Sequence, residues 1–354
     1  MKKILLFIII TLTSIILSNT AFATYKFVVP QKPGGGTTVW AEIVSKELEK
    51  FLGEDIELVL IPGARDIPGF NEFHNNLQFD DKTIMVSHGG NGVSFLQEEV
   101  DYDYREYDSV GLMNLNIIVG KPKNENVDNP TIGACSGCVP EAIAITLLMC
   151  GPGKSVDEYI SCFKDKVSWV SGMSTAERRL AFKRGELNVT RENPAAYRKH
   201  VASNDNAEVW FHHGLLEAIT GFHLDDPNFP GKQLENLFKE KWGEYPEGEF
   251  YDTYKLVKSF RDGLQKALWI KKDSPYKNKI VTALDRMSAD PSSRKVFKEK
   301  VGNYQWRIGT YGDIQRNKLM TFVTEPALKN LVKFNKEALG LASVYKPSLV
   351  WKKS

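Results

Sequence analysis

Short β-rich runs alternate with helix-length amphipathic segments along most of this chain of 354 residues. The run YKFVVP at 25–30 precedes a helical pattern that begins near Thr38, and further β-rich runs follow at 56–63, 82–90 and 114–121. Such alternation is typical of βαβ units, in which helices cover both faces of a mostly parallel sheet. The sequence therefore predicts an α/β fold.

The second half of the chain repeats this pattern. Residues 130–151 read as strand, small-residue turn and helix, and residues 166–193 read as strand, turn, helix and strand. The stretch 221–250 is rich in proline, glycine and charged residues, so we expect a surface excursion there. Helices and a closing strand are predicted beyond it.

The first 23 residues have the pattern of a secretory signal. Lys2 and Lys3 precede the apolar run ILLFIIITLTSIILS, and the small-residue sequence AFA follows at 21–23. The apolar run is shorter than the roughly 20 residues that a membrane-spanning helix needs. We therefore expect cleavage after Ala23 and a mature protein in the periplasm, with an uncleaved anchor helix as the alternative.

The charge balance gives no reason to expect a nucleic-acid partner. The full chain carries a formal net charge of +2, and loss of the two lysines of the signal would remove this excess. No RNP, zinc-finger or basic-region motif is present. The adjacent histidines 212 and 213 have no partners at metal-ligand spacing, so we predict no metal site. We also predict no cofactor and no catalytic residues.

Three consecutive glycines precede the first predicted helix. Gly34, Gly35 and Gly36 leave their backbone N–H groups uncovered by Cβ atoms, and the helix adds the positive end of its dipole. A carboxylate would fit such a cradle, with Thr37 or Thr38 capping the helix or turning its hydroxyl toward the ligand. From the spacing alone, a plain glycine-rich turn is an equally good interpretation.

The order of several motifs resembles a known family. PxxPGGGT precedes a helix, PGA ends a strand, and DDKTIMVS, DYREYDSVGLM, SGMSTAERRLAFKRGELN and KNKIVTALDRMSADPSSRKVFKEKVG follow in register. Each motif is weak by itself. Together they resemble, over nearly the whole mature chain, the extracytoplasmic solute-binding proteins of tripartite tricarboxylate transporters, the Bug or TctC-like family.

The resemblance implies a periplasmic-binding-protein-like fold, with two lobes of mostly parallel sheet, flanking helices and a ligand cleft between the lobes. Lobe 1 would comprise residues 24–121 and 263–354, and lobe 2 the inserted residues 122–262. The segments IIVGKP and ALWIKKDSP are candidates for the hinge.

The same resemblance implies a function. A monomer without enzymatic activity would capture a small organic carboxylate and deliver it to the membrane permease subunits of a tripartite tricarboxylate-type transporter. A receptor of the same fold that signals to a two-component system is an alternative. An enzyme on this scaffold is a further alternative, although no GxSxG or HExxH motif supports it.

The resemblance favours the anion cradle and adds three further turns to the predicted site. These turns contribute Ser87, His88 and Gly89, then Ser136 and Gly137, and finally Gly172, Ser174 and Thr175. Candidate partners for a second ligand carboxylate are Lys32, Arg65 and Arg191, each near the end of a predicted strand.

Two residues just beyond the glycines need separate interpretation. Thr38 stands where the family commonly has an acidic residue, which favours a plain organic acid over an amino acid as ligand. Trp40 shares a helix face with Ile43 and Val44, so we expect a core position rather than stacking on an aromatic ligand.

Four cysteines lie between positions 135 and 162, and export makes disulfides plausible. Cys150 ends a predicted helix and Cys162 lies on the next short one, so we predict a bridge between them. Cys135 and Cys138 form a CxxC pair without a thioredoxin-like context or a second pair for zinc. Small buried residues or a local disulfide are the better interpretations.

Overall fold

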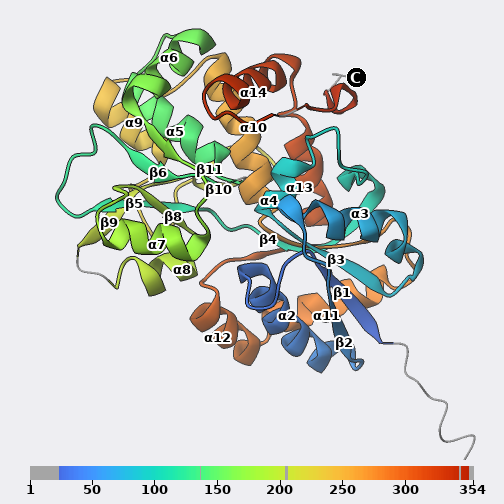
Figure 1. The fold of residues 1–354 in the computed structure, drawn as a ribbon. Helices are drawn as coiled ribbons and strands as arrows, with labels where there is room; N and C mark the ends of the chain where they lie inside the picture. The colour runs from blue at the N-terminus through green and yellow to red at the C-terminus, as the bar shows by residue number, and fades with distance from the viewer. Residues whose placement is uncertain (1–23, 136, 204–205, 343, 351–354) are drawn as a thin grey trace, which may run out of the picture.

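The computed structural model describes residues 24–135, 137–203, 206–342 and 344–350. The predicted signal sequence, its cleavage site at Ala23 and the predicted site residue Ser136 lie outside the described residues. The described residues form two α/β lobes that lie side by side (Figure 1). We call the body built on a six-stranded sheet lobe 1, and the body built on a three-stranded sheet lobe 2.

The sheet of lobe 1 has the strand order β13-β4-β12-β3-β1-β2. Its strands are β1 (Tyr25–Val29), β2 (Ile56–Leu60), β3 (Thr83–His88), β4 (Tyr107–Met113), β12 (Lys266–Lys271) and β13 (Trp306–Ile308). The helices of this part of the chain are α2 (Gly36–Leu52), α3 (Ile67–Asn75), α4 (Gly89–Ser94), α11 (Lys277–Ala289), α12 (Pro291–Lys300) and α13 (Thr310–Met320).

The first helix shows how the sequence sets these elements. In α2, Trp40, Val44 and Leu48 recur every fourth residue and are buried against the sheet, which is the spacing of one helix face. The ring of Trp40 packs 5.6 Å from that of Trp306, so the predicted core position is confirmed. The helix ends at Gly53, whose φ of 72° is readily adopted only by glycine.

Lobe 2 contains a three-stranded sheet in the order β8-β5-β9 and two smaller pairings. Its strands are β5 (Ile118–Pro122), β6 (Thr131–Gly133), β7 (Ser168–Val170), β8 (Thr190–Glu192), β9 (Ala207–His212), β10 (Leu215–Leu216) and β11 (His223–Leu224). The helices around them are α5 (Val139–Cys150), α6 (Val156–Lys166), α7 (Thr175–Lys183), α8 (Pro194–His200), α9 (Leu234–Trp242), α10 (Glu249–Gly263) and α14 (Glu325–Glu337).

Short 3-10 helices lie in connecting segments. They are η1 (Ala64–Asp66), η2 (Leu77–Phe79), η3 (Tyr104–Glu106) and η4 (Pro347–Leu349). Within the described part of the chain, no helix is both long enough and apolar enough to span a membrane.

The α/β fold is confirmed, but the predicted mostly parallel pairing is wrong for much of both sheets. Strands β1, β2 and β3 are parallel to one another, and β6 is parallel to β7. Strands β12 and β13 run antiparallel to their neighbours, and β5 is antiparallel to both β8 and β9. In the large sheet, β12 is inserted between β3 and β4 when the chain returns from lobe 2, and it runs opposite to both. A run of β-rich residues predicts a strand but does not indicate the direction in which that strand pairs.

The chain crosses between the sheets at two places. It leaves lobe 1 at residues 114–117, between β4 and β5, and returns at residues 264–265, between α10 and β12. These crossings lie beside the two predicted hinge segments, whose residues mostly belong to strands β5 and β12. The exact limits of the lobes stay a prediction.

Two parts of the chain bear on the predicted division. Helix α14 lies in the segment predicted for lobe 1 and packs on α6 and α10, with Phe334 against Phe163. The stretch 221–250 is only partly a surface excursion, because Leu234 and Phe238 of α9 are fully buried. Their apolar spacing buries one face of α9 even though its sequence is rich in charge.

The structure forms two disulfides. Cys150 is bonded to Cys162, the pair that the sequence favoured, and this bridge ties the end of α5 to α6. Cys135 is bonded to Cys138, so the CxxC pair is a local disulfide. It closes the turn that leads from β6 into α5.

Candidate functional site

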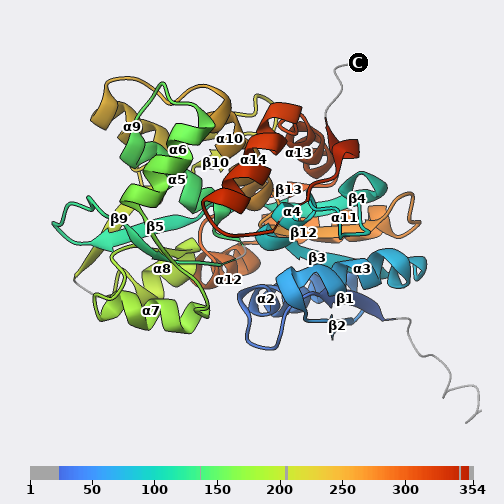
Figure 2. The ribbon, with the colours of Figure 1, turned by 45° about the horizontal axis from the view of Figure 1, so that its top comes forward.

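A cleft of about 970 Å³ separates the two lobes. On the lobe 1 side it is lined by Gly34–Gly36 and by the outer face of the first turns of α2. On the lobe 2 side it is lined by the N-terminal turn of α7 and by α8, and the end of α12 closes it. Figure 2 shows α7 and α8 opposite α2. The cleft therefore lies where the predicted fold places its ligand.

The lining of this cleft is strongly basic. Its lysine and arginine side chains are Arg179, Arg198, Lys199, Lys266, Lys298 and Lys300. Among the described lining residues, Glu299 is the only acid. Part of the charge is compensated, since Arg179 forms a two-pronged ion pair with Glu192. The remaining excess favours a negatively charged ligand.

The start of α2 presents free donors to the cleft. The N–H of Gly35 donates to the Lys32 carbonyl at 3.1 Å, and the N–H of Thr37 donates to Gln31 Oε1 at 3.0 Å. Within the described residues, no hydrogen bond is formed by the N–H groups of Gly34 and Gly36. Two backbone donors at the positive end of a helix of 17 residues are thus available to an anion.

Lys266 lies behind this turn. It is the first residue of β12, and its register places it between His88 of β3 and Met113 of β4. Its Nζ donates to Thr37 Oγ1 at 2.8 Å, and the residue is 7% exposed while it lines the cleft. Burial lowers the pKa of Lys266 to about 7, although the charge of Asp66 acts in the opposite direction.

The sequence interpretation missed Lys266. The predicted hinge segment ALWIKKDSP begins one residue after Lys266. The available signal is the lysine just before the apolar run ALWI, and an ordinary lysine at a strand end has the same appearance.

His88 is the last residue of β3 and lies near Gln31, which comes just before the glycine turn. Its Nδ1 accepts from the N–H of Gly90 at 2.9 Å, which caps α4. Because Nδ1 accepts, the proton lies on Nε2, which is 2.5 Å from Asp66 Oδ2 and 3.4 Å from the amide of Gln31. The predicted residue His88 therefore holds Asp66 in place beside the cradle, while the amide nitrogen of Gln31 is a neighbour and not a hydrogen-bond partner of the protonated Nε2.

Three other predicted residues of lobe 1 have their polar groups occupied. The Ser87 hydroxyl accepts from Trp269 Nε1 at 2.8 Å in the core, and the N–H of Gly89 donates to Gln265 Oε1 at 3.0 Å. The Thr38 hydroxyl donates to the Lys32 carbonyl at 2.8 Å. These groups therefore have partners within the protein, and direct ligand contact through them stays a prediction.

The turn before α7 contributes less than predicted. Ser174 caps α7 by accepting from the N–H of Glu177, and exposed Gly172 does not line the cleft. Thr175 does line it, and its hydroxyl accepts from Arg178 Nη2 at 3.0 Å. Lys32 is exposed away from the cleft lining, and the side chain of Arg65 lies outside what the structure describes.

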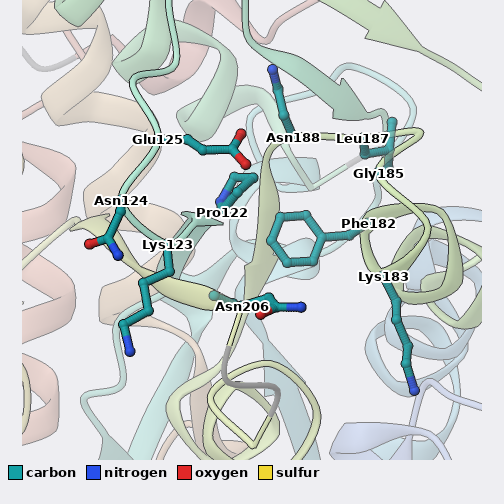
Figure 3. A pocket seen from close by; sticks show the side chains of 11 residues that line it. Pro122, Lys123, Asn124, Glu125, Phe182, Lys183, Gly185, Leu187, Asn188 and Asn206 are labelled. Carbon is teal, nitrogen blue, oxygen red and sulfur yellow. The ribbon is translucent and has the colours of Figure 1, made fainter.

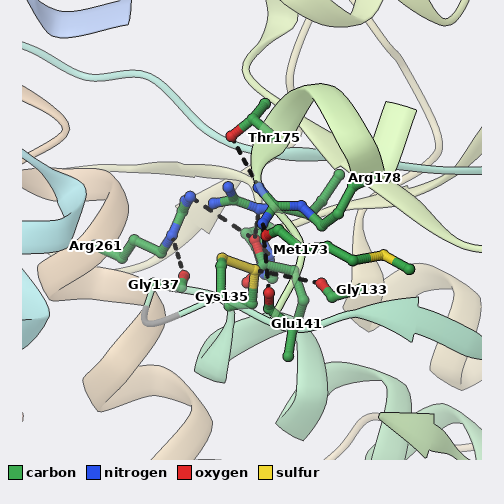
Figure 4. The surroundings of a disulfide bond; sticks show 12 residues. Gly133, Cys135, Gly137, Glu141, Met173, Thr175, Arg178 and Arg261 are labelled. Atoms are coloured by element: carbon green, nitrogen blue, oxygen red, sulfur yellow. Dashed lines mark hydrogen bonds and ion pairs between the residues drawn. A yellow bond between two sulfur atoms is a disulfide. The ribbon is translucent and has the colours of Figure 1, made fainter. Parts of the chain in front are cut away.

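Glu141 and Arg261 belong to a cluster around the local disulfide (Figure 4), and Arg191 pairs with this Glu141. The Nε of Arg191 lies 3.0 Å from Glu141 Oε1, and Arg261 Nη2 lies 3.9 Å from the same oxygen. Arg261 also donates to the carbonyl of Gly137 at 2.8 Å. Burial is the largest single influence and would raise the pKa of Glu141, but the charge of Arg191 and the contacts with His213 together outweigh it and hold that pKa below its usual range.

The cluster bears on two of the predicted residues. Glu141 is the carboxylate that Arg191 binds, so its guanidinium is already paired within the chain. The Gly137 carbonyl accepts from Arg261. Ligand binding by the N–H of Gly137 stays a prediction.

A second hollow, of about 800 Å³, lies at the end of lobe 2 beyond β5 (Figure 3). Its charged side chains are Lys123, Lys183 and Glu125, beside the ring of Phe182. The charges are mixed, and the hollow has no part in the cleft between the lobes. In the part of the chain that the structure describes, no group of three His, Cys, Asp or Glu side chains is placed to hold a metal ion.

Comparison with known proteins identifies the fold. No protein-family model and no curated protein matches the sequence. Among solved structures, the periplasmic binding protein BugD is similar, with a TM-score of 0.54, 13% identity and coverage of 89% of this chain and 97% of that chain. MatC from Rhodopseudomonas palustris with bound malate is also similar, with a TM-score of 0.53 and 16% identity. The match covers 89% of this chain and 98% of that chain.

A TctC solute-binding protein from Polaromonas has a TM-score of 0.56 at 13% identity, with 88% of this chain and 98% of that chain covered. At such identities the likeness concerns the fold. These matches confirm the periplasmic-binding-protein-like α/β fold that the sequence predicted.

Proposed function

We propose that this protein is a periplasmic solute-binding protein of the Bug or TctC-like kind, which captures a small organic carboxylate in the cleft between its lobes. Binding without chemical turnover is followed by delivery to the permease subunits of a tripartite tricarboxylate-type transporter. Export through the signal sequence at 1–23 would place the protein in the periplasm.

One observation carries the proposal. The cleft combines two unpaired backbone donors, Gly34 and Gly36, with an excess of lysine and arginine side chains from both lobes. Backbone N–H groups and ammonium groups recognise a carboxylate by hydrogen bonds and charge. The fold shared with MatC, a protein solved with bound malate, is consistent with this ligand class.

A thermal-shift screen tests the proposal. The mature protein is heated with mono-, di- and tricarboxylates, aromatic acids and acidic amino acids, and the hits are titrated by calorimetry. Saturation at about 100 times Kd stabilises a protein by roughly 2.7 kcal/mol, which is readily seen as a rise in Tm. The amide analogues of the hits serve as uncharged controls.

The outcomes of the screen are distinct. Binding of carboxylates, without binding of their amides, is the expected result. Tighter binding of glutamate than of 2-oxoglutarate would contradict the preference for plain acids that Thr38 suggests. Failure of every carboxylate to bind, or turnover of a bound one, would overturn the proposed function.

A further inference from the structure

Lys266 is a buried lysine for which the described residues provide no ion-pair partner. Its Nζ has one recorded hydrogen bond, to the neutral hydroxyl of Thr37. The acid whose charge acts on it is Asp66 on η1, and the Asp66 carboxylate already binds His88 Nε2. On β4, its other neighbour in register is the apolar Met113.

Such an arrangement is costly for the empty protein. Removing an ammonium group from water without a counter-ion is strongly unfavourable, and a hydroxyl compensates only part of the loss. Lys266 lines the same cleft as Gly34 and Gly36, which present free N–H groups there. Costly groups of this kind concentrate at functional sites.

We propose that Lys266 is the principal cation for a carboxylate group of the ligand, bound together with the N–H groups of Gly34 and Gly36. This inference rests on the proposed function and names the residues that carry it. The ligand supplies the counter-ion that the chain lacks, and Thr37 holds the ammonium group toward the cleft in the meantime.

Binding is then linked to proton uptake. Because burial holds the pKa of Lys266 at about 7 in the empty protein, part of the population is neutral at physiological pH. A bound carboxylate favours the ammonium form and raises that pKa. Asp66 and His88 face the same region, and their mutual hydrogen bond is present before the ligand arrives.

The test uses Lys266→Met in the mature protein, titrated with malate, citrate, adipate and benzoate. Loss of a buried charge partner is expected to weaken carboxylate binding by about 30-fold or more. The Tm of the empty variant should equal or exceed that of the wild type, because an uncompensated charge has been removed. Lys298→Met, which removes an exposed lysine of the same cleft, is the control and should weaken binding only a few-fold.

Calorimetry in two buffers of different ionisation enthalpy supplies a second readout. Near pH 7 the wild type should take up about half a proton per bound carboxylate, and Lys266→Met none. If the variant binds as tightly as the wild type, or both take up the same number of protons, the inference fails while the proposed function stands. A lower Tm with unchanged affinity also overturns it, by showing a structural role. A wild type that binds none of the four acids overturns both.

Discussion

Lys266 and Thr37 are 229 positions apart in the sequence, and the ammonium group of the first donates to the hydroxyl of the second at 2.8 Å. Lys266 begins β12, which lies in the large sheet between β3 and β4 after the strands of lobe 2. The glycine turn at the start of α2 therefore receives its cation from a strand distant in the sequence, through the tertiary pairing of the large sheet.

Replacing Thr37 with valine should weaken carboxylate binding while the protein stays folded. The ammonium group of Lys266 loses its recorded partner, so its protonated form becomes harder to maintain. A lost hydrogen bond to a charged group is worth about 1.5–3 kcal/mol. Thr37→Ser, which keeps the hydroxyl, should bind as the wild type does in calorimetry.

Thr38→Val is the matched control for this position. The Thr38 hydroxyl bonds to the Lys32 carbonyl, so its loss should affect stability and leave affinity nearly unchanged. Equal affinity losses for the two valine variants would contradict the assignment of Thr37 to the site.

Alanine substitutions at Gly36 and Gly35 should differ in their effect on the stability of the protein. A Cβ at Gly36 meets nothing within 4 Å, so Gly36→Ala should change the free energy of unfolding by less than about 0.5 kcal/mol. Its methyl group lies at the cleft, however, and should weaken binding of an anion to the N–H groups. A Cβ at Gly35 would lie 2.8 Å from Gln31 Oε1, so Gly35→Ala should displace that side chain and destabilise the turn.

Urea unfolding and calorimetry on the two variants separate these effects. We expect lost affinity with retained stability for Gly36→Ala, and a loss of both for Gly35→Ala. Full affinity in Gly36→Ala would exclude the glycine N–H groups as ligand donors.

The sequence predicted the fold better than the site, for a physical reason. Alternating β-rich and amphipathic segments report local structure, so the α/β fold, the core position of Trp40 and the bridge between Cys150 and Cys162 could be inferred. Side-chain partners depend on tertiary contacts. Nothing near Arg191 in the sequence indicates that Glu141, 50 positions away, already pairs with it.

The same reason applies to the partners of the predicted site residues. Ser87 precedes a glycine turn, and its hydroxyl accepts from Trp269 of the returning strand, a partner that the local sequence does not indicate. Lys266 was overlooked because only the pairing of β12 with β3 places it next to the cradle. A turn that resembles a binding loop can be recognised in the sequence. The sequence does not show which of its hydrogen-bonding groups already have partners within the folded protein.

Glu141→Gln should be among the most damaging substitutions in the protein. Glu141 is fully buried between Arg191 and Arg261, and removing its charge breaks the ion pair with Arg191. Arg261 keeps Asp262 at 3.0 Å. Breaking a buried ion pair in this way costs about 3–5 kcal/mol. Glu208→Gln, which breaks a partly exposed pair with Lys121, is the control and should cost at most about 1 kcal/mol.

The acid dependence of stability checks the same residue. Because the pKa of Glu141 is lower in the folded protein, its contribution is present above the unfolded pKa and is lost as pH falls through the folded one. The wild type should therefore lose more stability on acidification than Glu141→Gln. Parallel acid profiles for the two would show that Glu141 is not held as a carboxylate.

The two disulfides should differ in their contribution to stability. In the loop-entropy model, the Cys150–Cys162 bridge, with a separation of 12, contributes roughly 3 kcal/mol, and a three-residue separation contributes roughly half as much. Urea unfolding of the two double-alanine variants measures both. A larger loss at Cys135 and Cys138 would mean that their bridge also holds the arginine cluster around Glu141.

The stability of the empty protein should rise with pH through a contribution from Lys266. The pKa of Lys266 is lowered from 10.5 to about 7 by burial, so between these values the unfolded chain binds more protons than the folded one. Stability then increases by up to about 1.4 kcal/mol per pH unit from this group. Below pH 7 both states carry the proton and the cost of burial is constant.

Urea unfolding at about pH 6, 8 and 9, on wild type and Lys266→Met, isolates this contribution, because all other titrating groups are shared. The difference between the two proteins should favour the wild type increasingly as pH rises. A saturating carboxylate keeps the lysine protonated, so the rise should be suppressed in the bound wild type. A pH-independent difference between the empty proteins would show that Lys266 keeps its ordinary charge, and with it the predicted proton uptake on binding would be lost.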